Sequence, residues 1–423
     1  MMSGNTLGVL GSDVKVGLPD GTKIAYANLD YAASAPCLRE VADVVGELLP
    51  LYASVHRGAG ALSQLCTEKY ELARASVTAF LGCRVDDEVV FTRNTTDALN
   101  LLAHAVPPDT VVITFEGEHH ANLLPWKEVV RLPAPSSPAA AVSAVTTALA
   151  GQTTERPILL AVTGASNVTG EVWPLADLAA TAHRFGARIA VDAAQLAPHR
   201  RIDIAALDLD YVAFSGHKLY APFGTGVLAG RADWLDRARP YLSGGGATAH
   251  VGDTPGEVDW AVGAARHEAG SPNVIGAVAL AAACDALAAA DLDTLRADED
   301  ALMNRLHDGL AGIPEVRILG AGDSWPDRLG IVSFTVDGVE TRTVSTRLAA
   351  EFGIGVRDGL FCAHPFTRRL LDQAGATAPT AVRASIGVGT TTEHIDRLVT
   401  GIRTIAGSRV PADPAVRVGH YDG

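Results

Sequence analysis

The 423-residue sequence has few cysteines and no long apolar run, and each absence excludes a class of protein. Its five cysteines form no Cys-x-x-Cys pair and no even disulfide framework, which favours a reduced, cytoplasmic protein. The longest uncharged apolar run, Val274–Cys284, is too short to span a bilayer and predicts a core helix. The first residues, MMSGNTLGVLGSDVKVG, lack the charged and apolar regions of a signal peptide. We therefore expect no membrane partner.

Positive charge is also scarce. The chain has 34 Lys and Arg against 48 Asp and Glu, which gives a formal net charge of −14 at pH 7. An acidic chain without a long basic run argues against binding to nucleic acid or to anionic membranes. Hydrophobic residues make up 48% and charged residues 19%, as in an ordinary globular protein with two or three domains or one large and one small domain.

Strand-like and helix-like segments alternate between about Glu88 and Gly230. The strand-like segments are apolar on both faces, and helical patterns such as DALNLLAHAV and LADLAATAHRFG lie between them. This alternation predicts an α/β fold with a largely parallel sheet that is covered on both sides. The strand-like segments are EVVFT, TVVITF, PILLAVTG, ARIAVDAA and YVAFSG.

The sequence pattern changes after an alanine-rich helix that ends near residue 290. A long helix over about Leu292–Leu310 and the segments GIVSFTV, TRLAAEFGIGVR and VRASIGVG then predict a smaller α/β domain. We therefore expect an N-terminal segment over residues 1–25, a large domain over 26–290, a small C-terminal domain over 291–407 and a frayed tail over 408–423.

Polar residues directly follow several of the predicted strands. Ligands of open α/β sheets bind beyond the carboxyl ends of the strands, so these residues form one candidate site. They are Asn94, Thr95 and Thr96 after VVFTR, His119 and His120 after TVVITF, Asn167 after PILLAVTG, Asp192 and Gln195 after RIAV, and Ser215, His217 and Lys218 after YVAF.

Each of these features also has an ordinary structural interpretation. A lysine beyond a strand is usually solvated, and a Thr-Thr-Asp sequence before a helix is first of all a cap. The His119–His120 pair has no third ligand at a suitable local spacing, so we predict no metal site. The glycines of FGTG and GGG lack the remainder of a dinucleotide-binding fingerprint.

Taken together, the strand-end residues match the needs of pyridoxal 5'-phosphate (PLP). This cofactor requires a lysine for its aldehyde and an acid for its pyridinium nitrogen, which Lys218 and Asp192 could supply. Thr95 and Thr96 offer hydroxyls and helix N-terminal amides for the phosphate. Ser215 and His217 could donate further hydrogen bonds to the phosphate. Gln195 could form a hydrogen bond with the phenolate oxygen, and a histidine of EHH could stack on the ring.

The sequence resembles the cysteine desulfurase/selenocysteine lyase group of the class V aminotransferase family, which are fold-type I PLP-dependent enzymes. The resemblance runs from about Ala25 to Ile405. It implies a large domain with a mainly parallel seven-stranded sheet, a smaller α/β C-terminal domain and a homodimer. The motifs that carry it are LDYAASAP, SVHRGAGALSQLCTEKYE, FTRNTTDALNLLAH, EHHANLLPW, SNVTGEV, VDAAQ, FSGHKLYAPFGTGVL, EAGSPN, RDGLFCAHP and VRASIGV.

The resemblance also implies a role for each site residue. It makes Lys218 the lysine that binds the cofactor, with Asp192 at the pyridine nitrogen, Gln195 at the phenolate oxygen and His119 stacked on the ring. The phosphate would be bound by Thr96, Ser215 and His217, and by Ser271 from the second subunit. The substrate would be bound by Arg383 and Asn167 at its carboxylate, with His56, Arg57 and Arg357 around it.

Cys362 is the residue that discriminates between activities. The resemblance places it where desulfurases keep the cysteine that takes sulfur from the substrate. Its segment is bounded by glycine and flanked by Arg357 and His364, which favours an exposed thiolate. Many members of the group have two histidines directly before this cysteine, whereas this chain has Leu360 and Phe361.

The leading prediction is therefore a cysteine desulfurase that converts L-cysteine, or selenocysteine as a variant, and passes sulfur through Cys362 to a sulfur-acceptor protein. The second is a PLP-dependent C–S β-lyase acting on an S-substituted cysteine or a cysteine sulfoxide, in which Cys362 is dispensable. An aminotransferase or epimerase of the same class comes third. A non-catalytic scaffold with the same fold would have no need of the Lys218, Asp192 and His119 set.

Overall fold

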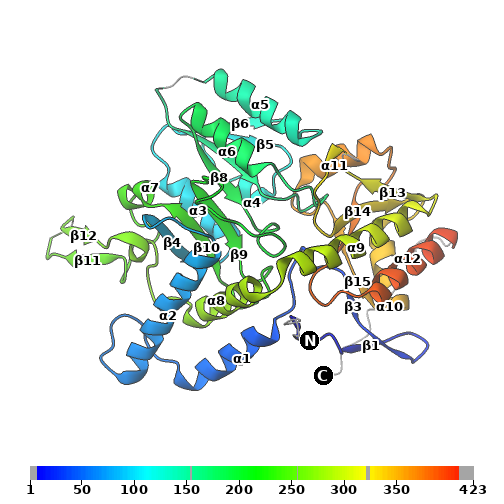
Figure 1. Ribbon diagram of the computed structural model, residues 1–423, viewed down its shortest axis with the longest axis horizontal. Helices are drawn as coiled ribbons and strands as arrows, with labels where there is room; N and C mark the ends of the chain where they lie inside the picture. The colour runs from blue at the N-terminus through cyan, green and yellow to red at the C-terminus, as the bar shows by residue number, and fades with distance from the viewer. Residues whose placement is uncertain (1–6, 153–154, 255, 321–323, 409–423) are drawn as a thin grey trace. The chain divides into compact units, whose positions relative to one another are not determined.

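The structure is a computed structural model that describes residues 7–152, 155–254, 256–320 and 324–408 (Figure 1). The chain forms two compact units. Unit 1 comprises the described parts of Met1–Pro36, Ala165–Val172 and Ala290–Gly423, and unit 2 comprises those of Cys37–Gly164 and Trp173–Ala289. The domain limits expected from the sequence stay a prediction, and the expected tail lies, apart from its first residue, outside the described residues.

The centre of unit 2 is a seven-stranded sheet. Its strands are β4 (Asp87–Thr92), β5 (Val111–Phe115), β6 (Val129–Leu132), β7 (Ile158–Thr163), β8 (Arg188–Asp192), β9 (Tyr211–Ser215) and β10 (Gly226–Arg231). Their order is β4-β10-β9-β8-β7-β5-β6, and only β10 pairs antiparallel with its neighbours. Strands β5, β7 and β9 are buried at every residue, as apolar runs in a doubly covered sheet should be. This confirms the predicted α/β fold with a mainly parallel seven-stranded sheet.

Helices lie on both sides of this sheet (Figure 1). They are α1 (Arg39–Leu48), η1 (Leu49–Leu51), α2 (Ala61–Phe80), α3 (Thr95–Ala105), α4 (His120–Leu123), α5 (Pro138–Ala150), α6 (Leu175–Arg184), α7 (Ala232–Arg237), η2 (Gly263–Arg266) and α8 (Val274–Ala289). The alanine-rich α8 packs against α1 and α2 and is buried at most of its positions, so the predicted core helix is confirmed. Strands β11 (Thr248–Val251) and β12 (Val258–Trp260) form a separate hairpin.

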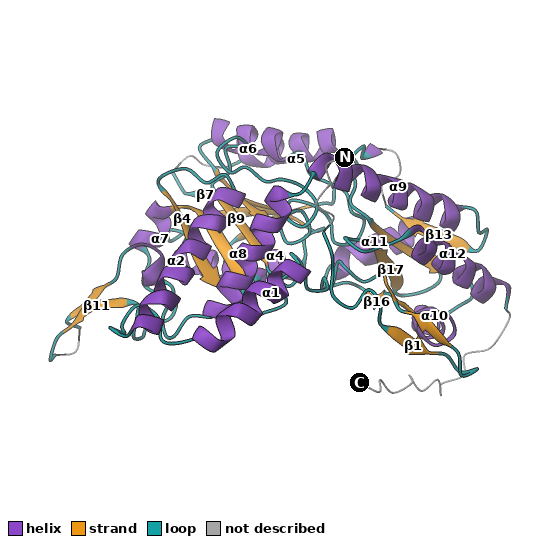
Figure 2. Ribbon diagram, turned by 60° about the horizontal axis from the view of Figure 1, so that its bottom comes forward, coloured by secondary structure: helices purple, strands orange, loops and turns teal. Residues whose placement is uncertain are grey.

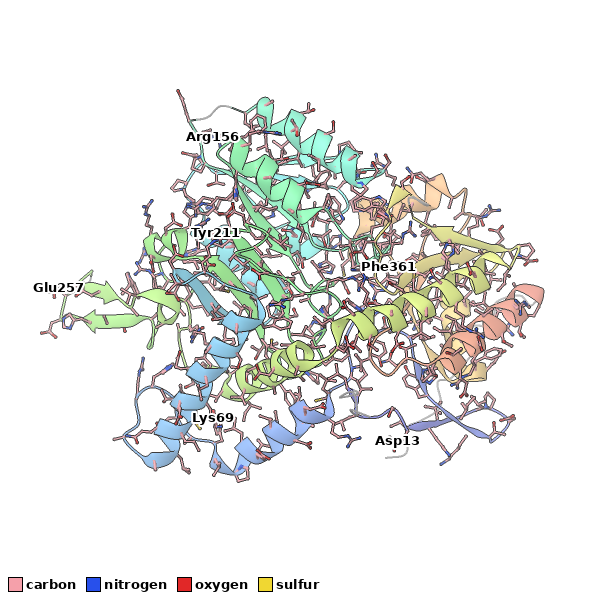
Figure 3. All side chains as sticks on the ribbon, viewed as in Figure 1. Asp13, Lys69, Arg156, Tyr211, Glu257 and Phe361 are labelled. Carbon is pink, nitrogen blue, oxygen red and sulfur yellow. The ribbon has the colours of Figure 1, made fainter. Side chains whose placement is uncertain are left out.

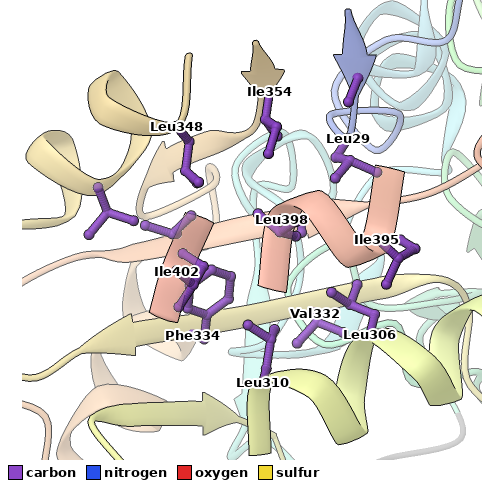
Figure 4. Close-up of a cluster of buried hydrophobic side chains, with 14 of the residues drawn as sticks. Leu29, Leu306, Leu310, Val332, Phe334, Leu348, Ile354, Ile395, Leu398 and Ile402 are labelled. Atoms are coloured by element: carbon purple, nitrogen blue, oxygen red, sulfur yellow. The ribbon is translucent and has the colours of Figure 1, made fainter. Parts of the chain in front are cut away.

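Unit 1 is built around a four-stranded sheet in the order β13-β14-β17-β16, and Figure 2 labels β13, β16 and β17 of this sheet. Its strands and helices are β13 (Val316–Leu319), β14 (Ile331–Val336), β16 (Arg357–Gly359), β17 (Ala381–Ser385), α9 (Leu292–Ala311), α10 (Thr341–Phe352), α11 (His364–Gln373) and α12 (Thr392–Gly407). Two short pairs, β1 (Lys15–Gly17) with β2 (Lys23–Ala25) and β3 (Ala27–Asn28) with β15 (Ile354–Gly355), complete it. Figure 4 shows its core, in which Phe334, Leu398 and Ile402 are fully buried.

No single helix in the described part of the chain is long and apolar enough to cross a membrane, and α8 and α9 meet that test only when they are counted together.

The carboxyl ends of the central strands position the candidate site of unit 2. Strand β8 ends at Asp192 and β9 ends at Ser215. Helix α3 begins beside them, with the side chain of Asn94 accepting a hydrogen bond from Asp97 N at 3.0 Å as its cap. Strand β10 passes so close to this helix start that a Cβ atom at Gly226 would lie 2.5 Å from Asn94 Cα. The glycine therefore allows the end of β9 and the start of α3 to meet.

Candidate active site

Asp192 and Lys218 form the charged centre of the cluster in unit 2. Asp192 is 4% exposed, and its Oδ1 accepts a hydrogen bond from Ala194 N at 3.0 Å. Burial raises the pKa of Asp192, while the Ala194 N–H and the positive charge of Lys218 act in the opposite direction. The predicted lysine and acid from two strand ends are therefore close enough to interact. Burial and the Lys218 charge also lower the pKa of His217 to about 4.

Hydroxyl groups gather where β9 meets the start of α3. The Oγ atom of Ser215 accepts a hydrogen bond from Thr95 N at 2.7 Å and shares another, also 2.7 Å long, with Thr95 Oγ1. Both residues are buried, whereas Thr96 is exposed in the first turn of the helix. A helix start with neighbouring hydroxyl groups offers donors for an anion such as a phosphate.

His119 and its neighbours occupy the end of β5. The Nδ1 atom of His119 accepts a hydrogen bond from Ala121 N at 3.0 Å, which makes His119 the cap of the short helix α4 and leaves any proton of a neutral ring on Nε2. Gln195, after β8, is 4% exposed. No group of three or more His, Cys, Asp or Glu side chains that could hold a metal ion occurs among the described residues.

Three predicted residues of unit 2 lie in exposed segments. His56 has a left-handed backbone (φ 68°), and its Nε2 contacts Glu71 Oε1 at 2.8 Å. Arg57 lies beside the backbone of Gly245 and Gly246. Ser271, which comes shortly before α8, is exposed in the single chain.

A second cluster of predicted residues lies in unit 1, around the guanidinium of Arg383. Its NH1 donates to Asn167 O at 3.0 Å, and its NH2 donates to Asp30 Oδ1 at 3.3 Å. The other carboxylate oxygen of Asp30 pairs with Arg357 Nε at 3.3 Å. One carboxylate thus faces two guanidinium groups. Burial lowers the pKa of Arg383 to about 10, and the charges of Asp30 and Cys362 oppose this shift.

Cys362 is the one exposed cysteine among the five, all of which are described and free. It follows β16 in a turn in which both Phe361 and Cys362 have left-handed backbones, with φ of 52° and 54°. Asn167 Nδ2 donates to Phe361 O at 2.7 Å and so fixes this turn. The thiol is therefore presented at the surface of unit 1 beside a positively charged cluster.

Reasoning from the sequence missed three residues that shape these clusters. Asp30 lies in the motif LDYAASAP, and Phe361 stands at a departure from the family pattern. The sequence predicts no role for either residue. Glu118, directly before His119, is fully buried between Thr163 N and Asn122 Nδ2, which donate to it at 3.0 and 2.8 Å. Burial raises the pKa of Glu118 to about 8, and the nearby Asp192 adds to this shift. The signal in the sequence was an acid placed three residues after the buried strand β5.

The mainly parallel sheet, with a lysine, an acid and hydroxyls at the ends of its strands, defines an α/β fold of the fold-type I class. Two solved structures share this fold. One is cysteine desulfurase CsdA from Escherichia coli in its S-sulfonic acid form, with a TM-score of 0.77, 33% identity, and coverage of 90% of this chain and 94% of that chain. The other is apo cysteine desulfurase from Thermococcus onnurineus NA1, with a TM-score of 0.80, 31% identity and the same coverage of both chains.

The family model of the class-V aminotransferases matches residues 27–398. Cysteine desulfurase from Escherichia coli O127:H6 is 36% identical over 398 residues, which cover 91% of this chain and 94% of the relative. Cysteine desulfurase from Dickeya dadantii is 37% identical over 405 residues, or 91% of this chain and 93% of the relative. The chain belongs to the class-V aminotransferase family, whose members use PLP.

Proposed function

We propose that the protein is a PLP-dependent cysteine desulfurase that converts L-cysteine to L-alanine and leaves a persulfide on Cys362. The observation that carries the proposal is the cluster in unit 1, where Cys362 is exposed beside two guanidinium groups that share one carboxylate. The unbalanced positive charge suits the carboxylate of an amino acid and a thiolate nucleophile. A lyase or an aminotransferase would have no need of the exposed thiol.

The residues of unit 2 fit the cofactor. Asp192 is a buried acid within electrostatic reach of Lys218, as the pyridine nitrogen and the aldehyde of PLP require. The buried hydroxyls at the start of α3 supply donors of the kind that bind a phosphate. We propose that the cofactor is held by Lys218, Asp192, Gln195, His119, Thr95, Thr96, Ser215, His217 and Ser271.

The protein residues then have distinct tasks. PLP, when bound, withdraws electrons from the substrate, which makes the proton on Cα acidic. Arg383, with Asn167 and Arg357 beside it, binds and orients the substrate carboxylate. Lys218 takes the proton from Cα, and Asp192 holds a proton on the pyridine nitrogen.

Cys362 carries out the transfer of sulfur. Its thiolate attacks the substrate sulfur, so that an S–S bond forms while the Cβ–S bond breaks. The electron pair left on Cβ takes up a proton, Lys218 returns a proton to Cα, and the products are alanine and a persulfide on Cys362. We propose that a sulfur-acceptor protein then takes the outer sulfur and that the reaction takes place in the cytoplasm.

Mass spectrometry after addition of L-cysteine tests this function. We expect alanine to accumulate and Cys362 to gain the mass of one sulfur atom. In Cys362→Ala, both signals should disappear while the cofactor absorbance remains, because Lys218, Asp192 and Arg383 are untouched. If Cys362→Ala cleaves L-cysteine or an S-substituted cysteine at the parental rate, the protein is a C–S β-lyase instead.

We propose that the active form is a homodimer. Ser271 is exposed in the single chain, as are His56 and Arg57 of the same unit. Exposed apolar side chains at Leu49, Leu51 and Tyr52 give the same unit a surface suited to a second copy. Sedimentation equilibrium should give about twice the monomer mass, and a fully active monomer would contradict the proposal.

A further inference from the structure

Phe361 contacts the catalytic cluster of unit 1 in two different ways (labelled in Figure 3). Its ring lies against the guanidinium of Arg383, with Arg383 Cζ 5.1 Å from the ring centroid. Its carbonyl oxygen accepts the hydrogen bond from Asn167 Nδ2 at 2.7 Å. Asn167 in turn accepts the hydrogen bond from Arg383 NH1 at 3.0 Å. Phe361, Asn167 and Arg383 therefore form a closed set of contacts.

The turn that carries these contacts has an uncommon backbone. Phe361 and Cys362 are consecutive residues with positive φ, a conformation that side chains other than glycine rarely adopt and that surrounding contacts must enforce. Ala363 N donates to Leu360 O at 2.9 Å, and Thr367 N donates to Ala363 O at 2.9 Å where α11 begins. The two neighbouring side chains of the turn differ in exposure, since Phe361 is 8% exposed while Cys362 is exposed.

The hydrogen bonds of Arg383 explain why an aromatic ring, that of Phe361, suits the position against its guanidinium group. The guanidinium has five N–H donors, and its buried Nε has no hydrogen-bond partner among the described residues. A carboxylate or carbonyl group against the guanidinium would occupy further donors and, if charged, neutralise it. An aromatic face attracts the cation without occupying any N–H group in its plane. The donors of Arg383 that Asn167 and Asp30 do not use thus stay available to an incoming anion, and Asp30 balances only one of the two guanidinium charges that it faces.

We propose that Phe361 is a positioning residue that serves both halves of the reaction. Its ring fixes the plane of the Arg383 guanidinium that receives the substrate carboxylate, and its backbone, held by Asn167, fixes the turn that presents Cys362. This inference rests on the proposed desulfurase function. It gives a role to the residue that stands where many relatives have a histidine, whose protonated ring would repel Arg383.

Phe361→Leu and Phe361→Tyr test the role of the ring. Leucine keeps an apolar side chain and loses the aromatic face, whereas tyrosine keeps that face. We expect Phe361→Leu to raise the KM for L-cysteine about tenfold, with a smaller change in kcat, as the loss of a buried cation–π contact predicts. Phe361→Tyr should restore the KM to within about twofold of the parental value.

Phe366→Leu is the matched control. Phe366 lies in α11 of the same unit and is also 8% exposed, but it has no cation–π contact with Arg383 among the described residues. We expect both leucine variants to lose similar stability in denaturant, and only Phe361→Leu to change the KM. Equal KM values for the two leucine variants would reduce Phe361 to ordinary packing and overturn the proposal.

A second readout is independent of turnover. Iodoacetamide should alkylate Cys362, the one exposed cysteine of the five. L-alanine, which carries the same carboxylate as the substrate, should slow this alkylation by occupying Arg383. We expect the protecting concentration of L-alanine to rise about tenfold in Phe361→Leu. Unchanged protection would overturn the role of Phe361. If the parental protein shows this protection but makes no alanine from L-cysteine, the desulfurase function fails, and only the positioning of Arg383 by the Phe361 ring stands.

Discussion

At the scale of single residues, the charge of Asp192 determines whether the cofactor can work. We predict that Asp192→Asn keeps the cofactor but forms alanine at least about 100-fold more slowly, as expected when a proton-holding group is lost. A neutral amide has the same shape but cannot hold a proton on the pyridine nitrogen. Alanine formation and the visible absorbance of the bound cofactor should be measured on the same sample.

Gln195→Glu offers the complementary control for this prediction. Gln195 is as buried as Asp192, at 4% exposed, but we assign it a neutral hydrogen bond and not a charge. A new acid there cannot take over the place of Asp192, so it should not restore the activity of Asp192→Asn. Turnover at the parental rate in Asp192→Asn alone would remove Asp192 from its role.

At the scale of elements, the strands with continuous apolar runs could be predicted from the sequence, and those with other patterns could not. The five predicted strands correspond to β4, β5, β7, β8 and β9. Strand β10 was missed because it begins inside a Pro/Gly-rich segment and is held by pairing with β4 and β9, which lie far from each other in the sequence. Strand β6 was missed because it is short and only partly buried.

Strand β10 gives a prediction at this scale. A Cβ atom at Gly226 would lie 2.5 Å from Asn94 Cα and 2.6 Å from Asn94 C, both of them backbone atoms. Gly226→Ala should therefore push the start of α3 away from Ser215, lower stability by about 1–3 kcal/mol and weaken cofactor binding about tenfold. Denaturant unfolding and titration with PLP measure the two effects.

Gly46→Ala is the control for the steric argument. Gly46 is an exposed position within α1 and has no atom near the place of a Cβ. Alanine there should stabilise the protein by about 0.5–1 kcal/mol and leave cofactor affinity unchanged, because glycine is costly within a helix. If Gly226→Ala behaves like Gly46→Ala, β10 does not determine the position of α3.

At the scale of the whole molecule, the chain does not divide into units in simple sequence order. Residues 165–172 belong to unit 1, where Leu329 N donates to Gly170 O at 2.8 Å. The backbone of Glu171 also forms an isolated antiparallel β-bridge with that of Arg328. Asn167 lies in this segment, which explains why it contacts Arg383 although it follows strand β7 of unit 2. The sequence could place Asn167 after a strand but could not predict this long-range pairing.

Glu118 makes the stability of the whole protein depend on pH. Its pKa is raised to about 8 in the folded state by burial and by the charge of Asp192, and its ordinary value is 4.5. Between these values the folded protein holds a proton that the unfolded chain has lost. The free energy of unfolding must therefore fall as pH rises through this window, with a slope of at most about 1.4 kcal/mol per pH unit from this group.

Glu118→Gln removes this titration and keeps an oxygen that can accept from Thr163 N. Denaturant unfolding of both proteins at about pH 5 and about pH 8 isolates the effect, because contributions from other groups largely cancel in the difference. We expect the variant to gain at least about 1 kcal/mol over the parental protein between the two pH values. A difference that stays constant with pH would mean that Glu118 is ionised in the folded protein. Its negative charge would then lie beside Asp192, and the positive charge of Lys218 would have to compensate for both acids.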